Sequence, residues 1–422
     1  MELTGGAGGA LPRSLVRSLR LFYAFRLLAT SYLFVPIFML FQAARGLSFA
    51  QALALGGLFS AVVVVVEIPT GLFADQLGRR RSMRLGALMM VASCLVAATA
   101  HSFGAFAIAE ILAGLSLALC SGADSAYLYE LLAAHDRAHT YGRHEATASA
   151  WHLLGSAVAF AGGGVLATLD LALPYLVTAG VAGAAAVVAW QLPDERSVIH
   201  TPQPPIAWGA AIADALAEVA RNRRLAWMVG YSAVVFVLLR ATVYVYQPYL
   251  HERGLAPLEI GLLFAGIHLI AAGVALRTHH LRERFGDGTL LWALLGLLAV
   301  SFLGLAGAGR GPWMLVLLVV QAVANGLYSP LTKPLLNREI TDPGRRATLL
   351  SVESMARRAA MGVFAPLVGL WGQADVMVLC GAVGLAGLIA LARRRPGAVT
   401  SLALDGLALV TIENETTDRG RC

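Results

Sequence analysis

Charged side chains are scarce in this chain of 422 residues. Asp, Glu, Lys and Arg make up 14% of it and hydrophobic residues 58%, whereas soluble domains carry about 25% charged residues. No soluble core can hide so much apolar surface, so lipid must be the solvent of this protein. The apolar runs are long and continuous, and backbone groups in lipid must bond internally. We therefore expect helices rather than strands.

Cysteine is scarce as well. Cys94, Cys120 and Cys380 lie inside apolar segments, Cys422 is the last residue, and no pair has the spacing of a metal site. We expect these cysteines to be small packing residues. The sequence also lacks a nucleophile–base motif, so it predicts neither an enzyme nor a bound metal or cofactor.

Twelve apolar segments are long enough to cross a bilayer, which takes about 20 residues. One polar segment divides them six and six. The spans are predicted at roughly 18–43, 50–73, 83–100, 104–132, 145–168, 172–192, 226–249, 257–279, 288–306, 312–334, 347–369 and 373–393. The sequence thus predicts an all-α membrane protein with six-helix bundles at 1–193 and 226–395. A linker with an amphipathic surface helix occupies 194–225, and a cytoplasmic tail occupies 396–422.

The net charge of +7 follows membrane orientation. Of the 32 Lys and Arg residues, 25 fall in segments that share one side if the N-terminus is inside. Cytoplasmic loops carry such an excess of Lys and Arg. Both termini are therefore predicted to be cytoplasmic, in an inner membrane, and no nucleic-acid partner is expected.

The most informative stretch is 71–81, where a long apolar segment ends. It places two glycines, one acid and three arginines in a tight basic turn. The pattern resembles the signature loop between helices 2 and 3 of the major facilitator superfamily (MFS) of secondary transporters. The resemblance implies the twelve-helix bacterial-type MFS fold. It also implies that this loop is a conformational latch that pairs with the N-terminal end of helix 11 and closes the cytoplasmic side. The latch residues are Gly71, Asp75, Gly78, Arg79 and Arg80.

A weak internal repeat supports two related halves. Arg45-Gly46-Leu47 returns 208 residues later as Arg253-Gly254-Leu255, and Gly78 returns as Gly286. The second copy has lost the arginine cluster, since residues 287–289 are Asp, Gly and Thr. We therefore expect an asymmetric latch in which the N-terminal half dominates.

Polar and aromatic side chains recur at helical spacing on four spans. These are helices 1, 4, 7 and 10, which line the central cavity in the superfamily. We therefore expect a small-molecule substrate cavity lined by Tyr23, Arg26, Thr30, Asp124, Tyr127, Arg240, Tyr244, Gln247, Gln321, Asn325 and Tyr328.

Ionisable residues inside the spans are costly, so each should face a partner or a wet cavity. Glu353 and Arg357 stand four residues apart and are predicted to form a structural ion pair within one helix. A carboxylate in a poorly hydrated cavity can exchange protons near neutral pH. Glu67, Glu110 and Asp124 are therefore candidates for proton coupling.

The resulting interpretation is a monomeric transporter that moves a small organic solute by alternating access, with proton-coupled efflux as the first hypothesis. Resemblance to exporter-like members of the superfamily is the basis for the direction. Two alternatives stay open. One is an organic-anion or organophosphate exchanger that clamps its substrate with Arg26 and Arg240. The other is a membrane sensor or scaffold that transports nothing.

Overall fold

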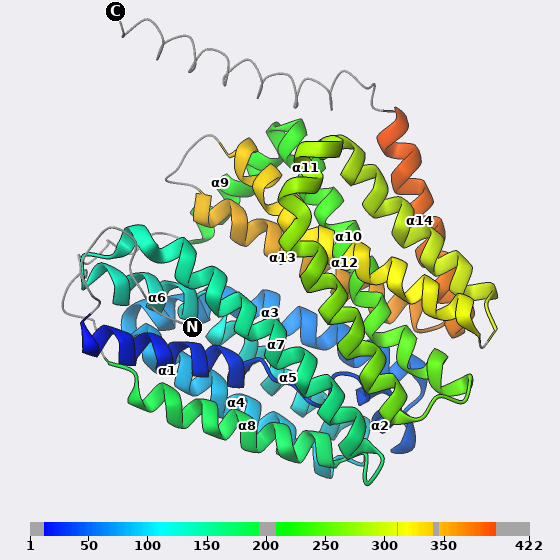
Figure 1. Cartoon of the computed structure of the whole chain (residues 1–422), viewed down its shortest axis with the longest axis horizontal. Coiled ribbons are helices and arrows are strands. Elements are labelled where there is room, and N and C mark those ends of the chain that lie inside the picture. The colour runs from blue at the N-terminus through cyan, green and yellow to red at the C-terminus, as the bar shows by residue number, and fades with distance from the viewer. Residues whose placement is uncertain (1–11, 194–207, 310, 341–345, 394–422) are drawn as a thin grey trace, which may run out of the picture.

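The structure is a computed structural model, described here over residues 12–193, 208–309, 311–340 and 346–393. The described residues form helices joined by short turns, in two halves (Figure 1). The N-terminal half comprises α1 (Arg13–Ala29), α2 (Phe38–Ala44), α3 (Phe49–Leu77), α4 (Arg79–Thr99), α5 (Phe103–Cys120), α6 (Ala123–Ala133), a 3-10 turn η1 (Ala138–Thr140), α7 (Tyr141–Ala167) and α8 (Leu173–Gln191). The linker helix is α9 (Trp208–Arg221), and the C-terminal half comprises α10 (Arg223–Glu252), α11 (Pro257–Gly307), α12 (Pro312–Glu339), α13 (Arg346–Val368) and α14 (Gln373–Arg393).

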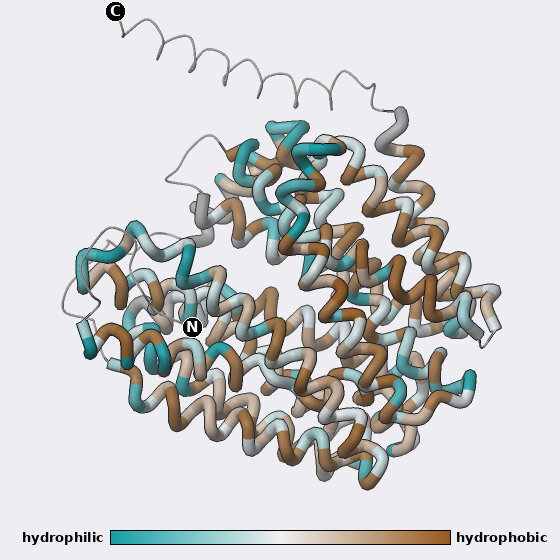
Figure 2. The backbone as a smooth tube through the Cα atoms, viewed as in Figure 1, coloured by the Kyte–Doolittle hydropathy of each residue, from teal (hydrophilic) through white to brown (hydrophobic). Residues whose placement is uncertain are grey.

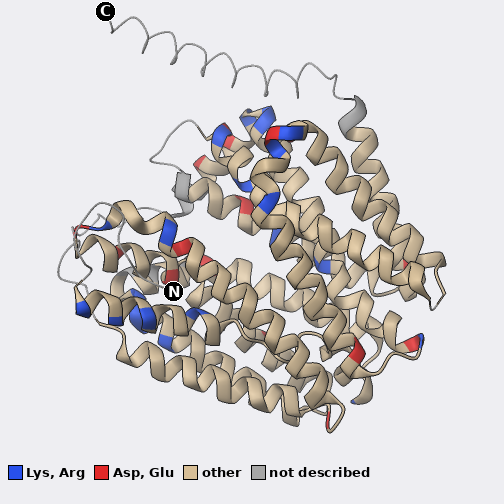
Figure 3. Ribbon diagram, in the orientation of Figure 1, with Lys and Arg blue, Asp and Glu red and all other residues tan. Residues whose placement is uncertain are grey.

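The helices have the length and composition of membrane spans. Within the described segments, nine helices are long and apolar enough to cross a bilayer. One of them, α11, consists of two helices that meet at Gly286, where φ is 76°. Figure 2 shows hydrophobic residues along most of the helices, and Figure 3 shows Lys and Arg gathered toward one end of each half. The predicted tail at 396–422 lies outside the described residues, as does the first part of the linker.

The turns at Gly78 and Gly286 mark what we call the arginine-rich end of the molecule. Both glycines have left-handed backbone, with φ of 101° and 76°, which side chains with a Cβ rarely adopt. At the opposite end, Gly46 and Gly254 are also left-handed, with φ of 86° and 80°. The two halves therefore use the same turn geometry at both pairs of repeat positions.

The two halves pack closely at the end opposite the arginine-rich turns, which we call the closed end. A Cβ on Gly164 of α7 would lie 2.9 Å from the Cα of Gly261 of α11. A Cβ on Gly57 of α3 would lie 2.6 Å from Pro366 of α13. Small residues allow such close helix contacts in membranes, and here they hold the halves together at this end.

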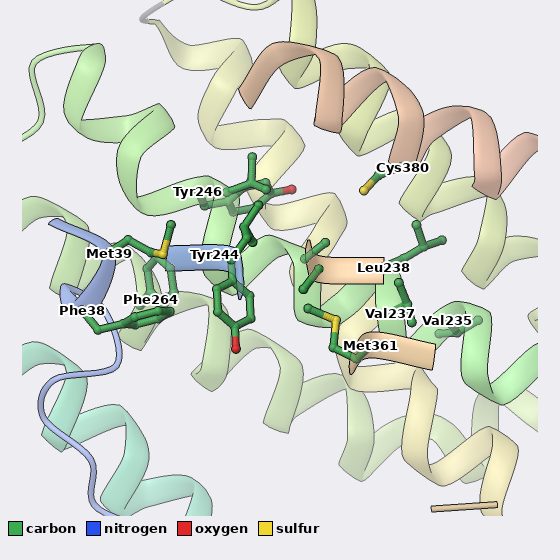
Figure 4. Packing of buried hydrophobic residues seen from close by; sticks show 14 of the residues in the cluster. Phe38, Met39, Val235, Val237, Leu238, Tyr244, Tyr246, Phe264, Met361 and Cys380 are labelled. Carbon is green, nitrogen blue, oxygen red and sulfur yellow. The ribbon is translucent and has the colours of Figure 1, made fainter. Parts of the chain in front are cut away.

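The hydrophobic core consists of two clusters of buried residues. The larger buried cluster contains residues of both halves. Figure 4 shows part of it, with Phe38 and Met39 of α2 beside Tyr244 and Phe264 of the C-terminal half. The rings of Phe38 and Tyr244 meet edge to face with centroids 5.3 Å apart. A second cluster, which includes Phe22, draws on the N-terminal half alone.

The first span is broken in the middle. The sequence predicted one helix over 18–43, but the chain is not helical between Ala29 and Phe38. Backbone groups freed by such a break need partners in a membrane. The backbone N–H of Leu33 donates to Thr178 at 3.0 Å, and the side chain of Gln247 supplies further partners that are described below. The break is therefore supported by side chains of α8 and α10.

Candidate substrate cavity

A cavity of about 690 Å³ lies between the two halves. It reaches the arginine-rich end, because Arg79 at the start of α4 and Asn337 near the end of α12 both border it. Its N-terminal wall comes from α3 to α6 and its C-terminal wall from α10, α12 and α13. The molecule thus combines an open cavity at one end with packed helices at the other.

One ion pair and several hydrogen bonds link side chains on the C-terminal wall. Arg357 Nε lies 2.8 Å from Glu353 Oε1, and Arg357 donates to the hydroxyl of Tyr328 at 3.3 Å. Tyr328 and Ser232 are 2.9 Å apart, and Ser232 donates to Glu353 Oε1 at 2.5 Å. The ion pair therefore does more than brace α13, because it ties α10, α12 and α13 together at the cavity surface.

The N-terminal half contains a partly buried cluster of one guanidinium and two carboxylates. Arg26 of α1 forms a salt bridge with Asp124 of α6, and its second nitrogen lies 3.6 Å from Glu145 Oε1 of α7. Ser125 also donates to that oxygen at 3.3 Å. The other oxygen of Glu145 is buried without a hydrogen-bond partner. We call Arg26, Asp124 and Glu145 the acid triad.

Among the half-buried Asp, Glu and Arg side chains of the predicted spans, four make no hydrogen bond or salt bridge with the residues that the structure describes. Two are acids and two are arginines, and all four are half-buried, namely Glu67, Glu110, Arg240 and Arg358. Glu67 borders the cavity between the halves, and one of its carboxylate oxygens is buried without a hydrogen-bond partner. Glu67 is therefore the member of this group that a solute or a proton in the cavity can reach.

The chain matches the family model of the Major Facilitator Superfamily over residues 21–366. It belongs to the major facilitator superfamily. No curated protein matches it.

Solved structures of MFS-type transporters share the fold of this chain. A variant of the nucleoside transporter NupG has a TM-score of 0.78 at 13% identity, with 90% of this chain and 99% of that chain covered. A POT family transporter in complex with 5-aminolevulinic acid has a TM-score of 0.72 at 13% identity, covering 93% and 98%. The human organic anion transporter MFSD10 has a TM-score of 0.59 at 19% identity, covering 90% and 100%.

Several residues that were predicted to line the substrate cavity form hydrogen bonds inside the N-terminal half. The hydroxyl of Tyr23 lies 2.5 Å from Nδ1 of His144. Tyr127 is 3% exposed and donates to the backbone oxygen of Pro193 at 3.1 Å. Thr30 donates to the backbone oxygen of Arg26 at 2.6 Å. Their partners lie on neighbouring turns and helices, so these side chains stabilise the half itself.

Of the predicted cavity residues in the C-terminal half, one lies on the cavity wall, and others lie inside the half or at the closed end. Tyr328 lies on the cavity wall. Gln321 is 2% exposed and bonds to Ser301 of α11, and Asn325 is half-buried one turn away. Tyr244 packs at the closed end, where a Cβ on Gly56 would lie 2.5 Å from its ring.

Gln247 joins the two halves at the closed end. It is fully buried. Its Oε1 accepts from the N–H of Met39 at 2.9 Å, and its Nε2 donates to the oxygen of Val35 at 2.9 Å. The sequence predicted a residue that faces substrate, but the side chain faces the broken backbone between α1 and α2.

The predicted latch turn lies at the mouth of the cavity. Gly71 borders the cavity. Arg79 Nε lies 3.3 Å from Glu130 Oε1, and Arg80 donates to the backbone oxygen of Leu192 at 2.7 Å. Asp75 belongs to the last turns of α3, but its side chain lies outside the described residues. Both arginines therefore have partners within their own half.

Sequence reasoning missed Glu145 as a site residue. It is the first residue of the predicted span at 145–168, a position typical of a solvated helix end. In the structure α7 begins at Tyr141, so Glu145 lies one turn inside the helix and points at Arg26. The available signal was Arg26, because the predicted span at 18–43 contains no acid that could pair with it.

Proposed function

We propose that this MFS protein is a twelve-helix secondary transporter that moves a small organic solute by alternating access. The observation that carries the proposal is the cavity of about 690 Å³ that reaches one end of the molecule, while glycine contacts close the other end. By the excess of Lys and Arg, the open end faces the cytoplasm. This conformation then receives solute from the cytoplasm, and rocking of the halves releases it outside.

The acid triad supports proton coupling. One guanidinium faces two carboxylates, so the cluster carries one surplus negative charge when both acids are ionised. Buried charges are costly unless they are paired. A proton on Glu145, whose Oε2 lacks a partner, removes that surplus. We therefore assign proton exchange to Glu145 and Asp124. Resemblance to exporter-like members of the family supports efflux as the direction.

The two alternatives receive less support. An anion clamp needs the guanidinium groups of both Arg26 and Arg240, but Arg26 is engaged by Asp124 and Glu145. A sensor or scaffold does not require a cavity between two halves. Organic-anion transport, the activity of MFSD10, therefore does not carry over to this chain on the basis of these two arginines.

The test uses everted membrane vesicles that contain the protein. A panel of small organic solutes is screened for uptake driven by an acidic vesicle interior. We expect at least one solute to accumulate, and Glu145→Gln to reduce accumulation to the level of empty vesicles while exchange of labelled for unlabelled solute continues. Glu252→Gln, an exposed acid at the closed end, is the matched control.

Two results would contradict the proposal in different ways. Solute accumulation that does not depend on the pH gradient would refute proton coupling. Normal gradient-driven accumulation by Glu145→Gln removes the acid triad from the proton pathway but leaves alternating access in place.

A further inference from the structure

A second hollow lies in the C-terminal half, separate from the cavity between the halves. It measures about 850 Å³ and runs along α10, the second helix of α11 and α14. We call it the lateral groove. It is bordered by Ala220, Arg223, Ala226, Trp227, Gly230, Tyr231, Val234, Leu295, Gly387 and Ala390.

The lateral groove faces the membrane rather than the substrate cavity. Successive residues of an α-helix turn by about 100°, so Gly230 and Ser232 project from nearly opposite sides of α10. Ser232 borders the substrate cavity, whereas Gly230 borders the groove. Gly230 of α10 and Ala390 of α14, which border the groove, are themselves exposed on the outside of their helices. Apolar side chains on the outside of a spanning helix contact lipid, so a lipid chain is the natural occupant.

Glycine keeps the groove open and aromatic residues shape its wall. A Cβ on Gly230 would meet nothing within 4 Å. Trp227 and Tyr231 stack with centroids 5.2 Å apart and ring planes 26° apart. The hydroxyl of Tyr231 donates to the backbone oxygen of Leu291 at 2.9 Å. The wall is therefore held in place before any ligand binds.

Among the described residues that border the groove, Arg223 is the one cation, and it stands at the mouth. Arg223 is the first residue of α10 and is exposed, and it makes no hydrogen bond or salt bridge with the described part of the chain. Asn222 caps the helix by accepting from the N–H groups of Arg224 and Leu225 at 3.0 and 3.2 Å. A guanidinium matches the geometry of a phosphate. The groove thus joins a phosphate-binding group to an apolar channel.

We propose that the lateral groove binds one anionic phospholipid, with the phosphate at Arg223 and an acyl chain along Trp227, Gly230 and Val234. Because Ala220 of α9 also borders the groove, the bound lipid touches the linker helix as well as α10 and α14. Lipid tails are as apolar as the groove, so burial alone gives no selectivity. The headgroup contact therefore decides which lipid binds, and one Arg at an anionic membrane surface corresponds to roughly a fivefold preference.

The test reads the fluorescence of Trp227 in proteoliposomes with brominated lipids, which quench a tryptophan that they touch. The signal of Trp227 is the difference between the unaltered protein and Trp227→Phe. We expect brominated phosphatidylglycerol to quench this signal at about one fifth of the mole fraction needed by brominated phosphatidylcholine. Arg223→Gln should make the two lipids equal. Arg224→Gln removes the same charge outside the groove and should retain the preference.

A second variant tests the groove itself. Gly230→Leu fills the open space and should protect Trp227 from both lipids. Gly180→Leu is the matched control, since Gly180 is exposed on α8 and a Cβ there also meets nothing within 4 Å. Equal quenching by both lipids in the unaltered protein would overturn the proposal. So would unchanged quenching in Gly230→Leu, and the Arg223→Gln arm decides the matter if Gly230→Leu does not fold.

Discussion

The hydrogen bonds of Gln247 provide a direct test of how the closed end is held. This side chain belongs to α10, and its two inter-half partners are the backbone groups of Val35 and Met39. Alternating access must separate the halves at this end, and so must break both bonds. Gln247→Leu keeps the size of the side chain and removes both polar atoms. It should therefore favour the conformation in which the closed end is open.

The expected shift follows from the strength of such bonds. Side-chain hydrogen bonds inside membrane proteins contribute about 0.6 kcal/mol on average and about 1.7 kcal/mol at most. Loss of two bonds then costs the present conformation about 1–3 kcal/mol. Since 1.4 kcal/mol corresponds to a factor of ten, the population ratio should shift by roughly five- to a hundredfold.

The measurement is the distance between spin labels on the two halves. Thr168 follows α7 and Gly309 follows α11, and both are exposed at the closed end. Cysteines at these positions, in a protein without the four native cysteines, carry the labels. We expect Gln247→Leu to add a longer distance to the distribution measured by electron–electron double resonance.

The control is Gln321→Leu, which makes the same chemical change at another buried glutamine. Gln321 bonds to Ser301 within the C-terminal half, so its loss lowers stability without freeing the halves. An unchanged distance distribution in Gln247→Leu would refute the view that the hydrogen bonds of Gln247 hold the closed end together. An equal change in both variants would show that the effect comes from general loosening of the C-terminal half.

Two further predictions concern packing and the latch. A Cβ on Gly163 would overlap the backbone oxygen of Leu33, whereas one on Gly162 would meet nothing closer than 3.7 Å. Gly163→Ala should therefore lower the apparent Tm in detergent by several degrees, and Gly162→Ala should leave it unchanged. An unchanged Tm in both would contradict the close approach of α7 to the α1–α2 break. Asp75→Asn should impair solute transport with near-normal expression, and full transport activity would remove Asp75 from the latch.

The fold was predictable because its main determinants are local in sequence. Long apolar runs specify spanning helices whatever surrounds them. The left-handed turns need glycine, and Gly46, Gly78, Gly254 and Gly286 supply it. The backbone conformation at these positions favours glycine, and the glycines can be read from the sequence. The polar segment at 194–225 then separated the spans into two sets of six.

The candidate site was harder to predict because its contacts join distant segments. Helical spacing put Gln247 and Gln321 on the stripes that should face substrate, yet both side chains bond to protein groups on other helices. The partner of Gln247 exists only because the first span is broken, and Pro36 was the local signal for that break. Pro69 and Pro248 also stand within apolar spans but remain inside helices, so proline alone does not distinguish a break.

The two ends of the molecule are held by different chemistry, and this bears on how the latch operates. At the closed end, glycine packing and the neutral hydrogen bonds of Gln247 join the halves. At the arginine-rich end, Arg79 and Arg80 bind partners in their own half. The counterpart turn of the C-terminal half is held by Arg282, whose Nε lies 2.6 Å from Asp287.

Closure of the arginine-rich end must therefore exchange existing contacts within a half for contacts between halves. Such an exchange has a small net free energy, because exposed ion pairs contribute only about 0–1 kcal/mol each. A small difference is what a transporter needs at this end, since solute or a proton must be able to reverse it. The asymmetric latch predicted from the missing arginines at 287–289 stays a prediction. Arg79 and Arg80 of the N-terminal turn and Arg282 of the C-terminal turn all have partners within their own half, so both turns must give up existing contacts when this end closes.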